Sequence, residues 1–191
     1  HIVRTNRNCT RKPARWGDRL KGITNLAALV DEARRHDDLL EIARPADPYL
    51  EIAAVARATD AGPVTIFNNV TGHPGRRVIS NIFGSRARVA RLCKVDPAYL
   101  PRYLADAALN PIASRVVTKA PCQQNVIDSG IDIFKTIPVT QQTTDDAGYV
   151  IPGGLAIARD PETGAFNGSY HRMRMLGPDR TYEKRRPHCS R

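Results

Sequence analysis

The sequence of 191 residues has no long hydrophobic run, and no apolar stretch approaches the roughly 18 residues that a membrane-spanning helix needs. No apolar segment follows the basic N-terminus, so we expect no secretory signal. No CxxC pair is present, which argues against a zinc knuckle. The four cysteines, Cys9, Cys93, Cys122 and Cys189, are scattered along the chain. We expect them to be reduced thiols, as in a cytoplasmic protein.

Several signatures of familiar enzyme classes are also missing. There is no P-loop, no HExxH and no nucleophile elbow, and Gly153-Gly154 lacks both the GxGxxG spacing and a following helix. Internal repeats and low-complexity segments are absent as well. The chemistry of this protein must therefore be sought in a less familiar set of polar residues.

The positive charge lies at the two ends of the chain. Residues 1–22 carry seven Lys/Arg and one Asp, residues 180–191 carry five and one Glu, and the stretch between has 17 of each sign. A basic end can bind nucleic acid phosphates, but no basic–aromatic interleaving or recognition helix accompanies it. We therefore expect a solvated arm and no nucleic-acid partner; loss of binding on deletion of residues 1–22 would favour the alternative.

The first half of the chain alternates between helix and strand patterns. Asn25 and Ser85 are expected N-caps, and Asp47-Pro48 is expected to begin a helix that ends near Thr59. Cys93 is expected to be a small core residue. The helices are predicted over 26–36, 47–59, 86–93 and 98–109, and the strands over 39–44, 64–67 and 78–80.

After Pro111 the helical periodicity gives way to strands and turns. Strands are predicted over 115–118, 124–127, 149–159 and 165–176, with one helical turn at 131–134, a bulge at Pro152-Gly-Gly154 and a hairpin turn at 160–164. The fold class is therefore α+β. We predict a basic disordered leader (1–22), an N-terminal mixed α/β domain (23–111) and the first part of a β-barrel (112–191).

Polar residues follow the predicted hairpin turn. Asn167 and His188 have the amide oxygen and imidazole that can bind a divalent ion, and Arg172 suits a planar anion. Ser169 lies between them, but no carboxylate in this stretch is placed to complete a metal shell or to move a proton. The alternative is that these residues form only a polar strand exposed to solvent. Asp145 and Asp146 are expected to point apart in a solvated acidic loop, and His73 is expected to be exposed.

Three stretches resemble one enzyme family. They are residues 47–57 (DPYLEIAAVAR), residues 67–75 (FNNVTGHPG) continued in 81–86 (NIFGSR), and residues 149–164 (YVIPGGLAIARDPETG) followed by 167–177 (NGSYHRMRMLG). Over about residues 23–188 the chain resembles the UbiD-like decarboxylases, which depend on prenylated FMN. The resemblance implies reversible, non-oxidative decarboxylation of an aromatic or α,β-unsaturated carboxylic acid.

The family pattern also implies roles for individual residues. Asn167 and His188 would ligate a divalent metal, Mn²⁺ in type, with K⁺ as a further candidate ion. Ser169, Tyr170, His171 and Arg172 would line the flavin, together with Asn167 and His188. Arg172 would also contact the substrate carboxylate as part of a Glu-Arg-Glu network. The ending Pro187-His-Cys-Ser-Arg191 departs from the usual glycine-rich continuation.

The same resemblance implies a split β-barrel of flavin-reductase type, followed in the family by a C-terminal α/β domain that mediates homo-oligomers. The third metal ligand and both catalytic glutamates would lie beyond Arg191, so the 191-residue chain is expected to be an N-terminal fragment, inactive by itself. A flavin prenyltransferase would supply the cofactor. The alternative is a truncated, non-catalytic module that binds flavin or a partner.

Overall fold

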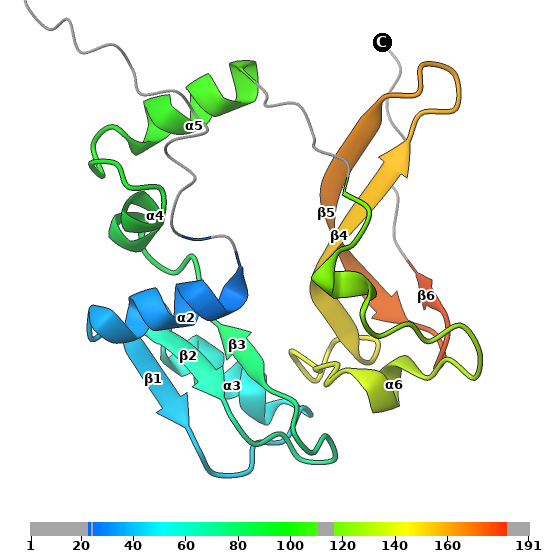
Figure 1. Ribbon diagram of the computed structural model, residues 1–191. Helices are drawn as coiled ribbons and strands as arrows, with labels where there is room; N and C mark the ends of the chain where they lie inside the picture. The colour runs from blue at the N-terminus through cyan, green and yellow to red at the C-terminus, as the bar shows by residue number, and fades with distance from the viewer. Residues whose placement is uncertain (1–22, 24, 111–116, 183–191) are drawn as a thin grey trace, which may run out of the picture.

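The computed structural model describes residues 23, 25–110 and 117–182, and its elements form two groups along the chain (Figure 1). The first group is α2 (Leu26–Arg35), β1 (Leu39–Ile42), α3 (Glu51–Ala58), β2 (Val64–Phe67), β3 (Val78–Ser80), α4 (Arg86–Leu92) and α5 (Leu100–Leu109). The second is the 3-10 helix η1 (Pro121–Gln123), α6 (Ile133–Thr136), β4 (Val150–Arg159), β5 (Phe166–Met175) and β6 (Thr181–Tyr182). The result is a mixed α/β architecture with two small sheets. The predicted leader and the boundary at Pro111 lie outside the described residues.

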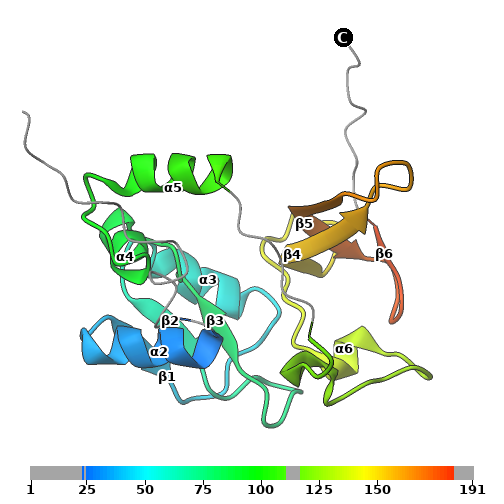
Figure 2. The same cartoon turned by 45° about the horizontal axis from the view of Figure 1, so that its top comes forward.

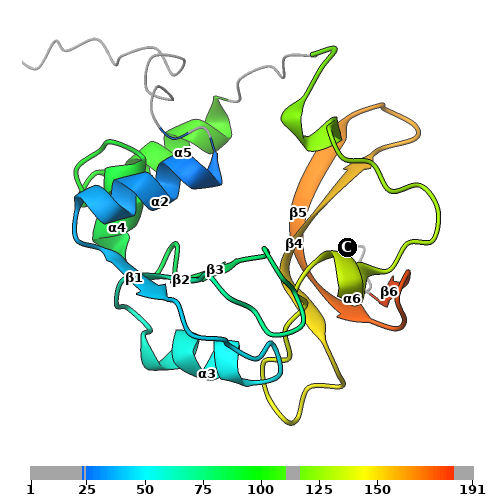
Figure 3. The same cartoon turned by 60° about the horizontal axis from the view of Figure 1, so that its bottom comes forward.

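The first sheet lies between two helices. Its central strand, β2, is parallel to β1 and antiparallel to β3. Figure 3 shows α2 and α3 on opposite faces of this sheet, which explains why all four residues of β2 are buried. The core cluster beside α3 is formed by Ala46, Ile52, Phe67 and Val70. This packing confirms the strands predicted over 64–67 and 78–80.

Helix α2 begins where the sequence predicts. The Asn25 side chain accepts a hydrogen bond from the Ala28 backbone N–H at 2.9 Å, which satisfies one of the free donors of the first turn. Leu29, Val30 and Ala33 are buried against the sheet, whereas Leu26 is exposed. The cap and the apolar face therefore agree on one orientation for this helix. The Ser85 cap of α4 is confirmed in the same way, by a 3.2 Å bond from Arg88 N to Ser85 Oγ.

Replacing Asn25 with alanine is expected to lower the free energy of unfolding by about 1 kcal/mol, because the capping acceptor is lost. Urea unfolding followed by circular dichroism would measure the change. Asn25→Asp is the matched control, since aspartate also caps helices well. Equal losses for the alanine and aspartate variants would show that the cap is not the stabilising contact.

Helix α3 begins later than predicted. The prediction placed its start at Asp47-Pro48, but the helix begins at Glu51, and Leu50 before it has a left-handed backbone with φ of 64°. The residues in between pair with the second group instead, since Leu50 N donates to Gln141 O (3.2 Å) and Gln141 N donates to Pro48 O (3.0 Å). A contact across roughly ninety residues of sequence thus overrides the local helix signal. The start of α5 likewise moves from the predicted residue 98 to Leu100.

A buried arginine holds α4 to the turn between α2 and β1. Arg88 is 3% exposed, and its guanidinium donates two hydrogen bonds to the carboxylate of Asp38, at 2.7 and 2.6 Å. Arg91 donates a third bond to Asp38 at 2.6 Å. The remaining Arg88 donors reach the carbonyl oxygens of Asn81 and Gly62. Every bond partner of this buried charge therefore comes from a different segment of the first group.

The second group is dominated by the hairpin of β4 and β5. Their ladder shifts register between Ile151 and Gly154, which confirms the bulge predicted at the Pro-Gly-Gly sequence. The turn that follows is closed by Asp160, whose carboxylate accepts from the backbone N–H groups of residues 162 and 163. Figures 1 and 2 show α6 below this hairpin and β6 beside it.

Three details of the second group differ from the predictions. Residues 124–127 are not a strand, and Val126 and Ile127 are exposed there. The short β6 was not predicted, because two residues carry no recognisable period. The helical turn predicted at 131–134 lies at Ile133–Thr136, with Asp132 as its cap. Of the strand predicted over 115–118, residues 115 and 116 lie outside the described residues, and residues 117 and 118 are not in a strand. A three-stranded second sheet is present, and the flavin-reductase type of barrel stays a prediction.

No helix within residues 25–110 and 117–182 is long and apolar enough to cross a membrane.

Candidate functional site

Strand β5 carries five of the six predicted site residues, and it divides them between two faces. Successive side chains of a strand point to opposite faces of the sheet. Asn167, Ser169 and His171 therefore lie on one face, and Tyr170 and Arg172 lie on the other. The sixth predicted residue, His188, lies outside the described residues.

The face with Asn167 has little bulk opposite its polar groups. In the ladder, Asn167, Ser169 and His171 lie across from Ala158, Ala156 and Gly154, respectively. Ser169 Oγ and His171 Nε2 are 2.6 Å apart, so a hydrogen bond links the two side chains along the strand. At the end of this series next to the bulge, a Cβ on Gly154 would come within 3.0 Å of the Met173 side chain, which packs over this glycine. This face therefore carries polar side chains of β5 next to small residues of β4, and the series of polar residues ends at Met173.

The opposite face is exposed, and it combines apolar and cationic groups. Tyr170 is 77% exposed and lies across the ladder from Leu155, which is also exposed. Arg172 is 62% exposed at its side chain, and its Nη1 lies 4.0 Å from Oδ1 of Asp146. This face therefore presents a guanidinium beside an aromatic ring.

Asp146 is the residue that sequence reasoning missed. We expected residues 145 and 146 to form a solvated acidic loop, and Asp145 is indeed exposed. Asp146 is instead half-buried, with 19% of its side chain exposed, because the loop turns it towards Arg172. The signal available in the sequence was the spacing Thr143-x-x-Asp146, which is typical of a side chain that closes a turn.

The main-chain groups of β5 alternate between its two edges. β4 pairs with one edge along the strand, and in the described chain β6 pairs with the other edge at residues 174–175. The main chain of Ala165 faces β4, and that of Leu176 faces β6, as their bonds to Asp160 and Arg180 show. Main-chain groups alternate in direction along an antiparallel strand. The groups directed away from β4 therefore belong to Phe166, Gly168, Tyr170 and Arg172.

The described residues do not by themselves make a metal site. No group of three or more His, Cys, Asp or Glu side chains that could hold an ion occurs among them. Asn167 is exposed on β5, and the second predicted ligand, His188, is not described. His73, predicted to be exposed, is half-buried, and its Nδ1 has no hydrogen-bond partner in the described chain.

Two family models match the chain one after the other. The N-terminal domain of 3-octaprenyl-4-hydroxybenzoate carboxy-lyase (UbiD) matches residues 30–108, and the Rift-related domain of the same family matches residues 115–188. The boundary between the two models falls close to the predicted boundary at Pro111.

Individual proteins match over the same region. The chain is 32% identical to a gallate decarboxylase of Lactiplantibacillus plantarum over 131 residues, which are 66% of this chain and 27% of that protein. It is 27% identical over 163 residues to an uncharacterised protein from the cooM 5′ region of Rhodospirillum rubrum, covering 83% of this chain and 35% of that one. The chain thus spans about a third of these relatives or less.

Solved structures agree with the fold. One is an evolved dimeric form of the UbiD-class enzyme HmfF from Pelotomaculum thermopropionicum in complex with prFMN, at a TM-score of 0.81 and 30% identity. It is matched over 84% of this chain and 38% of its own. Another is apo 3,4-dihydroxybenzoic acid decarboxylase (AroY) of Klebsiella pneumoniae, at a TM-score of 0.78 and 29% identity, over 85% of this chain and 37% of that one.

Proposed function

The chain belongs to the UbiD family of carboxy-lyases, and from this membership we propose that its protein decarboxylates an aromatic or α,β-unsaturated carboxylic acid with the help of prenylated FMN. The observation that carries the proposal is the arrangement of residues 167–172 on β5. Asn167, Ser169 and His171 lie on one face of the strand there, and the exposed guanidinium of Arg172 lies on the other.

The residues present fit the cofactor in three respects. The small side chains across from Asn167 and Ser169 leave room for a planar ring. The main-chain groups of Gly168, Tyr170 and Arg172, which are directed away from β4, would offer donors and acceptors to its rim. Asn167, with His188, would hold a divalent ion, Mn²⁺ in type, at the cofactor phosphate, with K⁺ as a further candidate.

The cofactor, once bound, supplies an electron sink for the charge that is left when CO₂ departs from an unsaturated carbon. The chain itself supplies orientation. Arg172 would bind the substrate carboxylate through paired N–H donors. We further propose a cytoplasmic homo-oligomer that receives its cofactor from a flavin prenyltransferase.

The proposal is tested by loading the full-length protein with prenylated FMN and Mn²⁺ and measuring CO₂ release from a panel of aromatic acids that includes gallate and 3,4-dihydroxybenzoate. Asn167→Ala is expected to lower the fraction of flavin that survives gel filtration by about tenfold, a typical cost of losing one metal-site partner. Arg102→Ala, a change of an exposed side chain on α5 in the first group, is the control and should retain the cofactor.

Two outcomes would contradict the proposal. Undiminished flavin retention by the Asn167 variant would remove this residue from the cofactor site. Firm flavin retention without CO₂ release from any acid would favour the other candidate, a non-catalytic flavin-binding module.

A further inference from the structure

A groove lies on the face of the first sheet that carries α2. It has a volume of about 430 Å³, which is large enough for a small organic molecule. Residues of α2 form one wall, and Ile66, the loop before β3 and the start of β3 form the other. The groove exists because α2 packs mainly against β1, so that this face of the sheet stays uncovered towards β3. Both walls therefore belong to the first group of elements.

The base of the groove is apolar. Ile66 and Ile79 pair across β2 and β3, so their side chains share one face of the sheet. Ile66 is buried and Ile79 is half-buried, and Leu26 and Val30 of α2 line the groove as well. No aromatic ring occurs among the described residues of this lining. The base therefore suits the aliphatic part of a ligand.

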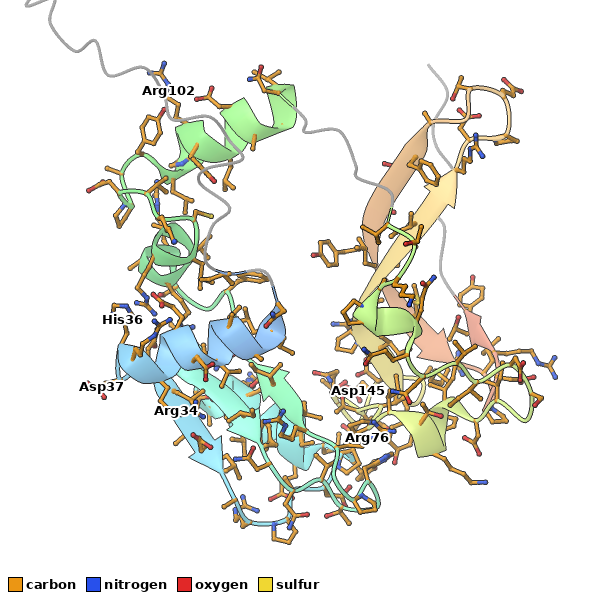
Figure 4. The ribbon with its side chains drawn as sticks, viewed as in Figure 1. Arg34, His36, Asp37, Arg76, Arg102 and Asp145 are labelled. Carbon is orange, nitrogen blue, oxygen red and sulfur yellow. The ribbon has the colours of Figure 1, made fainter. Side chains whose placement is uncertain are left out.

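The rim of the groove is cationic. Three arginines and one aspartate give its lining a net charge of +2; they are Arg34, Arg76, Arg77 and Asp31. In Figure 4, Arg34 lies beside α2 and Arg76 lies on the loop before β3, so the cations come from both walls. Arg34 is already engaged, because it pairs with Asp31 and with Glu41, each at 3.0 Å.

Arg76 and Arg77 keep their side-chain donors available. Both are exposed, and neither side chain forms an ion pair or a hydrogen bond with another residue of the described chain. Glu41, the nearest acid on this face, accepts bonds from Arg34 and Asn68, which hold its pKa below the usual value; the charge of Arg77 has a smaller effect in the same direction. The two adjacent guanidinium groups can therefore bind an added anion.

A fixed turn brings the two arginines to the groove. Arg76 N donates to His73 O at 3.1 Å, and Gly75 between them has a left-handed backbone with φ of 72°, which favours glycine. The cations are thus presented by a defined loop that leads directly into β3.

We propose that this groove binds a carboxylate with an aliphatic body, such as a medium-chain fatty acid. Arg76 and Arg77 would bind the carboxylate through their N–H donors, and the aliphatic chain would lie along the apolar base. An anion without an apolar part would leave the base exposed to water, and an uncharged chain would leave the arginines without a partner. The proposal does not depend on the decarboxylation proposed above, because no residue of β4 or β5 lines the groove.

The test measures octanoate binding to the full-length protein by calorimetry. Octanamide is the uncharged counterpart, and inorganic phosphate is the anion without an apolar part; we expect both to bind at least about tenfold more weakly than octanoate. Arg77→Ala should weaken octanoate binding about tenfold, the usual cost of losing a charged hydrogen bond. Arg57→Ala is the matched control, because it removes the same charge from an exposed position on α3, on the opposite face of the first sheet. It should stay within about twofold of wild type.

A second variant blocks the apolar part of the groove. Ala27 lines the groove and is exposed on α2, so a phenylalanine there would occupy the groove without disturbing the core. Ala27→Phe should lower octanoate affinity at least about tenfold while the circular dichroism spectrum stays unchanged. Loss of affinity in both Ala27→Phe and Arg77→Ala would support the proposal.

Four outcomes would overturn the proposal. Wild-type protein that does not bind octanoate, or that binds phosphate as tightly, has no site of this kind. Equal affinities of Arg57→Ala and Arg77→Ala, or an unchanged affinity of Ala27→Phe, would place the bound octanoate elsewhere. Binding that appears only after deletion of residues 1–22 would assign the groove to the chain itself.

Discussion

Replacing Arg172 with lysine is expected to lower kcat/KM for an aromatic acid by about 100-fold or more, which corresponds to about 3 kcal/mol of transition-state stabilisation. Lysine keeps the charge but loses the planar fork of N–H donors that binds both oxygens of a carboxylate. Steady-state CO₂ release by the loaded, full-length protein measures the effect. Binding of the flavin should change much less than turnover, since Asn167 remains.

The matched control for this prediction is Arg174→Lys. Arg174 lies two residues further along β5, on the same face and equally exposed, but it is outside the stretch of residues 167–172. Its replacement should leave kcat/KM within about threefold of wild type. Similar losses at both positions would show that the face needs only positive charge, and that Arg172 has no specific contact with the substrate.

Replacing Asp38 with asparagine is expected to lower the free energy of unfolding by about 3–5 kcal/mol, the second large effect. The change leaves Arg88, which is 3% exposed, without its anionic partner, while the two carbonyl contacts remain. A buried charge without a counter-charge carries a large desolvation cost. Urea unfolding of the protein would measure the difference.

The control lies one residue earlier in the chain. Asp37 is exposed, and Figure 4 shows its side chain at the outer end of α2, directed away from the first sheet. Asp37→Asn makes the same chemical change without a buried partner, and asparagine tolerates the left-handed backbone at this position, where φ is 50°. It should change stability by about 0.5 kcal/mol at most. Equal effects at both positions would contradict the role given to Asp38.

The stabilisation by Asp38 should depend on pH. Hydrogen bonds from Arg88 hold the pKa of Asp38 below its usual value, and those from Arg91 act in the same direction. The contribution is therefore complete above the pKa of the unfolded chain, about 3.9, and is lost as the pH falls through the lower folded pKa. The difference between wild type and Asp38→Asn should shrink in acid. A constant difference from pH 7 to pH 3 would show that the charge of Asp38 is not what stabilises the fold.

The strand that carries the candidate site residues was predictable, because the side chains of β5 alternate between two faces with a period of two residues. The hairpin, the bulge at residues 152–154 and the polar stretch of residues 167–172 were all expected from local signals, and the structure confirms them. The split of that stretch into two faces follows from the same alternation of side chains. Because residues 167 and 172 are an odd number of positions apart, alternation alone places their side chains on opposite faces of the strand.

The contacts of single side chains were not predictable. Asp146 looked like one of two equivalent loop acids, and only the turn closed at Thr143 distinguishes it from Asp145. No local signal marks Arg88 as buried, and its burial depends on Asp38, fifty residues earlier in the chain. The neighbouring sequence does not indicate which residue pairs with Arg88, because a charged side chain is compatible with solvent or with any suitable partner.

The sequence by itself determined the elements whose signals are local, such as the Asn25 cap, the buried strand at 64–67 and the hairpin turn at 160–164, and it identified the family through its motifs. The tertiary structure alone decided where α3 begins and which acid faces Arg172. Both depend on backbone or side-chain groups that are distant in sequence and meet only after packing. Two hydrogen bonds with Gln141 outweighed the helix start at Asp47, because one long-range bond stabilises about as much as one local cap and here two are gained.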